Sequence, residues 1–246
     1  MQNPVLILGA SGVIGAAIAR SLSENTPVLL HGLGPSEQLE TLAAELKHGP
    51  CEVETETADL CKTPDVEALF SRIQKKHEKL GGLVFAIARP FPHKLTHRTD
   101  WTVFQEQIDS QLKALHLSLT CALPLLEKQE TETRVIIMST EYVLGSPPVK
   151  IAPYVAAKSA LTAYARTIAQ EWIGRGVRVH ILAPGMVKSR LTADLPEMYI
   201  EEIVAELPEK RLTTAEDVAM VAKFLMSPEA DTLYGTVVPV SRAQRR

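Results

Sequence analysis

Tyr154 and Lys158 are the two residues whose types and spacing most directly suggest chemistry. They stand four positions apart in a segment with helical character, so they share one face of the expected helix. An ammonium about 4 Å from a phenolate stabilises it by roughly 4 kcal/mol at an effective dielectric near 20. That energy equals a fall of about three units from the usual phenol pKa near 10. The spacing therefore predicts a tyrosine that exchanges a proton near neutral pH.

A glycine-rich segment near the N-terminus suggests a place for a nucleotide. The apolar run Pro4–Leu8 predicts a buried parallel strand, and Val13–Leu22 predicts the helix that follows it. Glycines between these elements permit a sharp turn and a close approach of backbone amides to a pyrophosphate. The alternative is that they serve only tight packing of the helix on the sheet. The expected cofactor contacts in this turn are Gly9, Ser11, Gly12, Val13, Ile14 and Gly15.

The end of the second expected strand, Val28–Leu30, bears on which nicotinamide cofactor is used. An acidic residue there would bind the adenosine ribose hydroxyls and favour NAD(H). The segment His31-Gly32-Leu33-Gly34 has neither an acid nor an arginine, so nothing repels a 2′-phosphate and NADP(H) is weakly favoured. Asp59, with Leu60 beside it, follows the strand Val53–Thr57 and is the candidate acceptor for the adenine amino group. The alternative for Asp59 is a loop or helix cap.

The elements that must position these residues alternate between strand and helix along the chain. Alternation of this kind predicts an α/β fold with one open, mostly parallel sheet of about seven strands and helices on both faces. Residues 1–246 are therefore expected to form a single domain. Further strands are expected at Leu83–Ala88, Val135–Met138, Val177–Leu182 and Thr236–Val240. Further helices are expected at Ser36–Lys47, Asp65–Lys79, Trp101–Leu126, Ala152–Ile173 and Asp217–Met226.

The least regular stretch is Lys188–Arg211, which contains a short helix-like piece at Met198–Glu206. In a parallel α/β sheet this stretch would lie over the carboxyl ends of the strands, where ligands bind. It is therefore predicted to be a substrate lid.

Taken in order, these segments resemble the short-chain dehydrogenase/reductase family over nearly the whole chain. The second half is most similar to 3-oxoacyl-carrier-protein reductases, whereas Gly82–Ala88 is more similar to enoyl-carrier-protein reductases. The resemblance implies a Rossmann-type, doubly wound sheet. It rests on the glycine turn, Asp59, Ser139-Thr140, Tyr154-Val155-Ala156-Ala157-Lys158 and Ala183-Pro184-Gly185.

The resemblance also implies an NAD(P)(H)-dependent oxidoreductase, and specifically a ketoreductase. Tyr154 would protonate the substrate carbonyl oxygen while the nicotinamide delivers hydride to carbon. Lys158 would lower the pKa of Tyr154 and bind the nicotinamide ribose. The hydroxyl of Thr140 would hold the carbonyl oxygen, with Ser139 as the alternative. Further implied cofactor contacts are Ala86, Ile87, Ala88, Tyr154, Lys158, Pro184, Gly185, Val187 and Ser189.

Several positions depart from the pattern of that family. Gln111, counted here among the catalytic residues, stands where an asparagine is usual, and its extra methylene would alter a water relay to Lys158. Phe85–Ala88 replaces an Asn-Asn-Ala-Gly segment, Gly12 replaces a basic residue, and Ser241-Arg242-Ala243 replaces Asp-Gly-Gly. These departures motivate two alternatives. One is a catalytically impaired NAD(P)-binding sensor or scaffold; the other is an enoyl reductase, whose usual Tyr–Lys spacing is longer.

Composition narrows the expected partners to small molecules and copies of the chain itself. The net charge of -3 gives no sign of the basic surface that binding to nucleic acids requires. No signal peptide is recognised and no apolar run approaches the roughly 20 residues of a membrane span. The three cysteines are unclustered, which favours a reducing, cytoplasmic location.

The same resemblance implies a homodimer or homotetramer in which the helices expected at Trp101–Leu126 and Ala152–Ile173 pack against their counterparts. The expected substrate is a small carbonyl or alcohol compound, including an acyl thioester. His93 and His97 are spaced like metal ligands but lie in a loop without a third ligand, so no metal site is expected.

Overall fold

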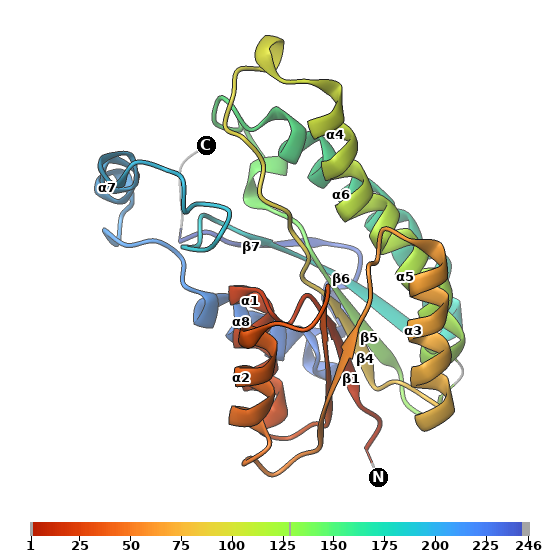
Figure 1. The fold of residues 1–246 in the computed structure, drawn as a ribbon. Coiled ribbons are helices and arrows are strands. Elements are labelled where there is room, and N and C mark those ends of the chain that lie inside the picture. The colour runs from red at the N-terminus through yellow and green to blue at the C-terminus, as the bar shows by residue number, and fades with distance from the viewer. Residues whose placement is uncertain (1, 128, 243–246) are drawn as a thin grey trace.

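The computed structural model describes residues 2–127 and 129–242 (Figure 1). Within these ranges one sheet of seven strands has the order β3-β2-β1-β4-β5-β6-β7. Every neighbouring pair is parallel, so the predicted doubly wound α/β sheet is confirmed. The strands are β1 (Val5–Leu8), β2 (Val28–Gly32), β3 (Val53–Thr57), β4 (Gly82–Phe85), β5 (Thr133–Met138), β6 (Val177–Pro184) and β7 (Val237–Val240).

Helices cover both faces of this sheet (Figure 1). One face carries α1 (Val13–Ser23), α2 (Glu37–Leu46) and α8 (Ala215–Leu225). The opposite face carries α3 (Thr63–Lys76), α4 (Trp101–Ile108), α5 (Ala114–Leu126) and α6 (Ala152–Trp172). A further helix, α7 (Glu197–Glu206), stands away from the sheet. No helix in the described part of the chain is long and apolar enough to cross a membrane.

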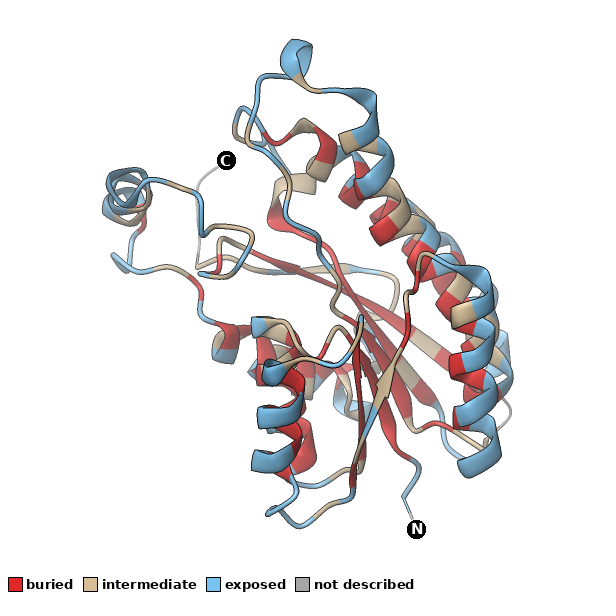
Figure 2. Cartoon of the chain, viewed as in Figure 1, coloured by how far each residue is buried: buried red, intermediate tan, exposed pale blue. Residues whose placement is uncertain are grey.

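The central strands are buried from both sides because their side chains alternate between two cores. Leu6 and Leu8 of β1 pack with the helices α3, α5 and α6, whereas Val5 and Ile7 pack with α1, α2 and α8. Figure 2 shows the resulting burial along the middle of the sheet and the exposed outer surfaces of the helices. This is why the strand sequences are continuously apolar and do not alternate with polar residues.

The strand order places the expected chemistry at one edge of the sheet. β1 pairs with β2 on one side and β4 on the other, so the connections after β1 and β4 diverge there. A crevice at such a divergence, beyond the carboxyl ends of the strands, is the usual ligand site of open α/β sheets. The glycine turn follows β1, Ala86–Ala88 follow β4, and Ser139 and Thr140 follow β5.

The helix expected over Trp101–Leu126 is not one regular helix. A π-helical turn, Asp109–Lys113, separates α4 from α5 and carries Gln111. The extra residue of a π-turn is seldom visible in a sequence pattern, because it shifts the apolar period by only one position. The strand expected over Leu83–Ala88 ends at Phe85, beside the last paired residues of β1 and β5.

Most other boundaries differ from the expected ones by one to three residues, as those of β2, α8 and α7 illustrate. β2 continues to Gly32 because Gly32 still pairs with Thr57 of β3. The helix expected at Asp217 begins at Ala215, since Thr214 and Asp217 form a reciprocal capping box at its start. α7 begins at Glu197, one residue before the expected start.

Candidate active site

A cavity of about 490 Å³ lies at the carboxyl ends of the central strands. It receives residues from the first turn of α1, from the segments after β4, β5 and β6, and from the first turns of α6. The sequence-predicted residues that line it are Ile14, Ala86, Ile87, Ala88, Ser139, Thr140, Tyr154, Lys158, Pro184, Gly185, Val187 and Ser189.

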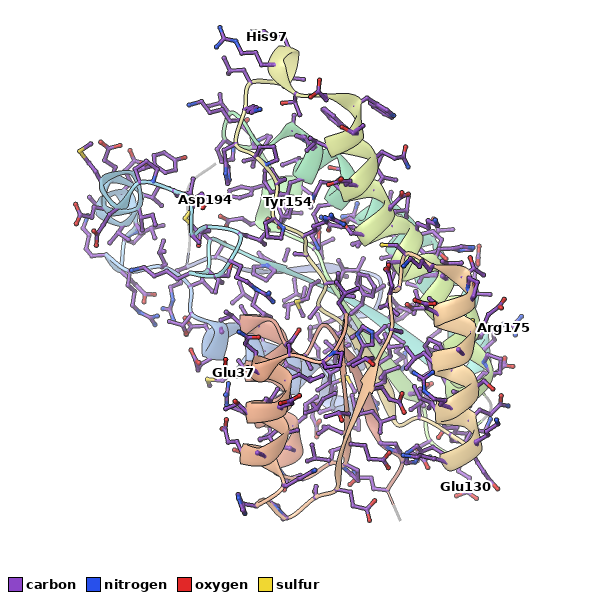
Figure 3. All side chains as sticks on the ribbon, viewed as in Figure 1. Glu37, His97, Glu130, Tyr154, Arg175 and Asp194 are labelled. Carbon is purple, nitrogen blue, oxygen red and sulfur yellow. The ribbon has the colours of Figure 1, made fainter. Side chains whose placement is uncertain are left out.

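Tyr154 stands in the first turn of α6, which starts at Ala152 and has Pro153 as its second residue. Its ring stacks on Phe91 from the segment after β4, with centroids 5.4 Å apart and planes 10° from parallel. A hydrogen bond with the Thr140 side chain joins the phenol to the end of β5. The phenol is therefore oriented from two sides and faces the cavity (Figure 3).

Lys158 lies one turn further along α6 and is almost completely buried, with 2% of its surface exposed. Its Nζ donates a hydrogen bond of 2.6 Å to the backbone carbonyl of Met138. Burial lowers the pKa of Lys158 to about 7, because the ammonium loses its hydration there. Lys158 can therefore gain or lose a proton near neutral pH.

The prediction that Lys158 lowers the pKa of Tyr154 is wrong for this structure. Burial raises the pKa of Tyr154 to about 12, and the hydrogen bond with Thr140 opposes this only in part. The physical reason is desolvation of the phenolate, which outweighs the attraction of a lysine that is itself buried and bound to Met138. At neutral pH the phenol accordingly keeps its proton.

The two candidate hydroxyls at the end of β5 have different environments. The Ser139 Oγ lies 2.5 Å from the Oγ1 of Thr162 on α6. Thr162 donates its own proton to the carbonyl of Lys158 at 2.7 Å, so the proton between Ser139 and Thr162 comes from Ser139. The Thr140 hydroxyl instead meets Tyr154. The two candidate hydroxyls therefore differ in their contacts. Ser139 bonds to α6 through Thr162, whereas Thr140 lies beside the phenol of Tyr154.

The glycine turn has the shape that a bound pyrophosphate needs. Gly9 adopts φ +91°, where a side chain would be strained, and a Cβ on Gly15 would lie 2.2 Å from the carbonyl oxygen of Gly9. Gly12 precedes α1 without a capping side chain, so the first amides of that helix are open to an anion. Gly15 at the same time serves helix–strand packing, which was the alternative interpretation of these glycines. The residues therefore fit a dinucleotide.

The segment after β2 holds no charge that would select between the two nicotinamide cofactors. Leu33 is 73% exposed. His31 is buried with its Nε2 3.1 Å from the Ala58 carbonyl, and burial lowers its pKa to about 4. The imidazole is therefore neutral, and the segment presents only apolar and backbone groups.

Asp59 is already used within its own turn. Its carboxylate accepts a hydrogen bond from the Cys61 amide at 3.0 Å and pairs with Lys62 at 3.3 Å. This is a local role within the loop before α3, which has Lys62 at its N-cap. Leu60 has its side chain in the core beside α3, so only its backbone is available to a cofactor.

Gln111 is not brought to Tyr154 in this structure. It is fully buried in the π-turn, and its Nε2 donates to Oε1 of Gln107 at 3.0 Å. Gln107 in turn donates to the carbonyl of Arg89 at 3.1 Å. Gln111 is absent from the residues that line the cavity. The extra methylene thus places its amide in a hydrogen-bond ladder within the helix.

Part of the outer half of the cavity comes from segments outside the predicted lid and outside the predicted site residues. Phe91 and His93 come from the irregular segment after β4, and Tyr142 and Lys150 from the connection between β5 and α6. The only available signal was their place after the carboxyl ends of strands. The segment predicted as a lid contributes Ser189, Leu191, Thr192, Asp194, Leu195, Pro196 and Tyr199.

Two remaining expectations concern His93, His97 and the C-terminal tail. Across residues 2–127 and 129–242 no three His, Cys, Asp or Glu side chains gather where they could hold a metal ion. Arg242 pairs with Asp217 at the start of α8. Ala243 lies outside the described residues.

Comparison with known proteins agrees with this geometry. The family model described as enoyl-(acyl carrier protein) reductase matches residues 9–242. Nodulation protein G of Rhizobium sp. (strain N33) is 32% identical over 96% of this chain and 94% of its own length. The 3-oxoacyl-[acyl-carrier-protein] reductase FabG of Thermotoga maritima is 26% identical over 96% of this chain and 94% of its own.

A solved structure extends this agreement to the fold. The Pseudomonas aeruginosa RhlG/NADP active-site complex superposes with a TM-score of 0.90 at 22% identity, covering 98% of this chain and 95% of that one. The sheet order, the glycine turn and the cavity with Tyr154 and Lys158 lead to the same conclusion as these matches. The chain belongs to the short-chain dehydrogenase/reductase family and is an oxidoreductase of that class.

Proposed function

We propose that the protein reduces a ketone carbonyl with a nicotinamide cofactor. The observation that carries this proposal is the meeting of Tyr154, Lys158 and Thr140 in one cavity beside the glycine turn. A phenol and a hydroxyl that face the same space can both donate to one carbonyl oxygen, which polarises the carbonyl group. When bound, the nicotinamide supplies the hydride.

The protonation states of the site favour reduction. A phenol whose pKa is raised to about 12 is a proton donor at neutral pH, as an acid for a developing alkoxide must be. Thr140 holds that phenol towards the cavity. Lys158, with its pKa near 7, can return a proton towards Tyr154 after turnover. In this proposal Tyr154 donates the proton, Thr140 orients the phenol and Lys158 returns a proton towards it.

For the cofactor we propose NADP(H) in preference to NAD(H). The segment after β2 offers no carboxylate to repel a 2′-phosphate, and Leu33 leaves that position open. The glycine turn supplies backbone amides for the pyrophosphate at the start of α1. The similar RhlG structure is described as an NADP complex. A binding titration in which NADH is held more tightly than NADPH would reverse this preference.

For the substrate we propose a 3-oxoacyl compound, such as an acyl thioester. The cavity wall is largely apolar and includes Phe91, Leu191, Leu195 and Pro196, which suits a hydrocarbon chain. The Thermotoga maritima relative carries the name of a 3-oxoacyl reductase.

We further propose that the protein forms a homodimer or homotetramer. Sedimentation at micromolar concentration tests this proposal, and a clean monomer would contradict it.

The decisive experiment follows NADPH oxidation by purified protein with matched 3-oxoacyl and 2-enoyl thioesters of one chain length. Ketoreduction predicts turnover of the 3-oxoacyl thioester and none of the enoyl thioester. The reverse result would assign enoyl reduction, the activity named by the family model. Tight NADPH binding without turnover of either compound, or of a wider panel of ketones, would contradict the proposal and favour a sensor or scaffold.

A further inference from the structure

Three ionisable side chains meet at the outer part of the cavity and have no role in the chemistry proposed above. His93 comes from the segment after β4, Lys150 from the connection between β5 and α6, and Asp194 from the segment after β6. Figure 3 labels Asp194, in the segment before α7, and Tyr154, in the first turn of α6. The three residues thus converge from three separate connections on one opening.

His93 is held at a defined place relative to the phenol. Its ring lies 4.9 Å from the ring of Phe91, and Phe91 stacks on Tyr154 at 5.4 Å. The imidazole is therefore two ring contacts away from the phenol. Burial lowers the pKa of His93, Asp194 raises it and Lys150 lowers it, so both charged groups lie within electrostatic reach of the ring. The lowered pKa favours the neutral form of the His93 imidazole, which carries one N–H donor.

Lys150 lines the cavity from a backbone position that a lysine seldom adopts. Its φ is 70°, in the left-handed region. For a residue other than glycine that conformation costs roughly 1–2 kcal/mol. Strained positions of this kind often occur where a side chain has a functional role. Here the strained residue directs an ammonium-bearing side chain to the lining that contains Tyr154.

We propose that Lys150 and His93 form a subsite for a carboxylate carried by the substrate. This inference rests on the proposed carbonyl reduction and adds free oxo acids to the acyl thioesters as substrates, because it places a carboxylate relative to the carbonyl that Tyr154 meets. Lys150 supplies the positive charge and His93 supplies an N–H donor, the pair of groups that carboxylates bind in proteins. Because His93 and Tyr154 contact the same Phe91 ring, the subsite suits a carboxylate close to the carbonyl in the same molecule.

Asp194 indicates why the ligand is a carboxylate. The lid segment itself presents a carboxylate near His93, since Asp194 lines the same cavity and acts on His93. A substrate carboxylate competes with Asp194 for His93, and a neutral substrate does not gain this contact.

The test compares levulinate with its methyl ester, together with the homologous pair that is one methylene longer. Each pair holds the ketone constant and changes only the charge. In the unaltered protein, kcat/KM for the acid should exceed kcat/KM for the ester in at least one of the two pairs. Lys150→Met should lower the acid-to-ester ratio about tenfold, the effect of losing one charge-assisted hydrogen bond. Lys150→Arg keeps the positive charge and should leave the acid-to-ester ratio at the value of the unaltered protein. Asp194→Asn should raise that ratio.

Two controls separate the subsite from general effects on the fold. Lys94→Met removes an exposed lysine next to His93 that does not line the cavity, and it should leave the ratio unchanged. His93→Phe keeps a ring against Phe91 but removes the N–H donor, so it should lower the ratio without loss of stability. An unaltered ratio in both Lys150→Met and His93→Phe would overturn the subsite.

A binding measurement distinguishes failure of the subsite from failure of the proposed function. Calorimetric titration of levulinate into the NADPH-saturated protein should show affinity that Lys150→Met weakens about tenfold. If neither compound is reduced but this binding still depends on Lys150, the subsite stands and ketone reduction falls. If the ester is reduced but Lys150→Met changes neither binding nor the ratio, reduction stands and the subsite falls.

Discussion

The inner and outer walls of the cavity are built in different ways. The inner wall, formed by Met138, Ser139, Thr140 and Lys158, is buried and follows directly from β5 and α6. The outer wall, formed by His93, Lys150, Asp194 and Tyr199, comes from irregular segments and from α7. The inner wall places its polar groups by buried hydrogen bonds, such as that from Lys158 to the Met138 carbonyl. The outer wall places them by ring stacking and a strained backbone.

This difference separates chemistry from selection. Proton transfer demands positions held to a fraction of an ångström, which regular elements and buried hydrogen bonds provide. Selection between substrates tolerates movement, and connections after strands can change without disturbing the sheet. Substitutions in the inner wall should therefore act on kcat and those in the outer wall on the choice of substrate.

The largest effect is expected at the phenol. Tyr154→Phe keeps the ring that stacks on Phe91 but removes the proton donor, so kcat should fall about 10³-fold or more. NADPH affinity, measured by fluorescence titration, should stay within about threefold of the original. Residual activity near the original level would show that the Tyr154 phenol does not carry the proton transfer.

The next prediction compares neighbouring hydroxyls of the inner wall. Thr140→Val removes the hydrogen bond to Tyr154 with little change in volume and should lower kcat about 10²-fold. Ser139→Ala removes the bond to Thr162 and should instead cost about 1 kcal/mol of unfolding free energy, with kcat reduced less than tenfold. Steady-state kinetics and urea unfolding of both variants check this. A larger kcat loss in Ser139→Ala would exchange the two roles.

Lys158 gives a pH-dependent prediction. Its pKa is about 7 in the folded protein and returns to its ordinary 10.5 on unfolding. The unfolded state therefore binds more protons between these values, so this group makes stability rise with pH in that window and adds no slope below it. Urea unfolding at pH 7 and pH 9 should show the protein gaining up to about 1.4 kcal/mol per pH unit relative to Lys158→Met. A constant difference between the two proteins would mean that Lys158 is not desolvated.

The smallest effect belongs to the outer wall. Lys150→Gly and Lys150→Ala both remove the ammonium, but only glycine adopts φ 70° without strain. Lys150→Gly should therefore be more stable than Lys150→Ala by about 1 kcal/mol, measured as a difference in urea unfolding. Equal stabilities would indicate that the backbone at this position relaxes, and the contrast between the walls would lose one of its supports.

Much of the fold and the inner wall followed from the sequence alone. Continuous apolar runs such as Val5–Leu8 require burial on both faces, which only a sheet between two helical layers provides. The spacing of Gly9, Gly12 and Gly15 and that of Tyr154 and Lys158 are local, so a helix or a turn brings them together without knowledge of distant contacts. Local spacing was sufficient for these residues because their neighbours in space are neighbours in the chain.

Only the tertiary structure decided the electrostatics and the outer wall. The pKa of Tyr154 depends on how completely α6 and Phe91 remove water, and desolvation reversed the shift that spacing alone had suggested. Gln111 was diverted to Gln107 by a π-turn that no period in the sequence marks. His93, Lys150 and Asp194 are more than forty positions apart from one another, and they meet because parallel strands end at the same edge of one sheet.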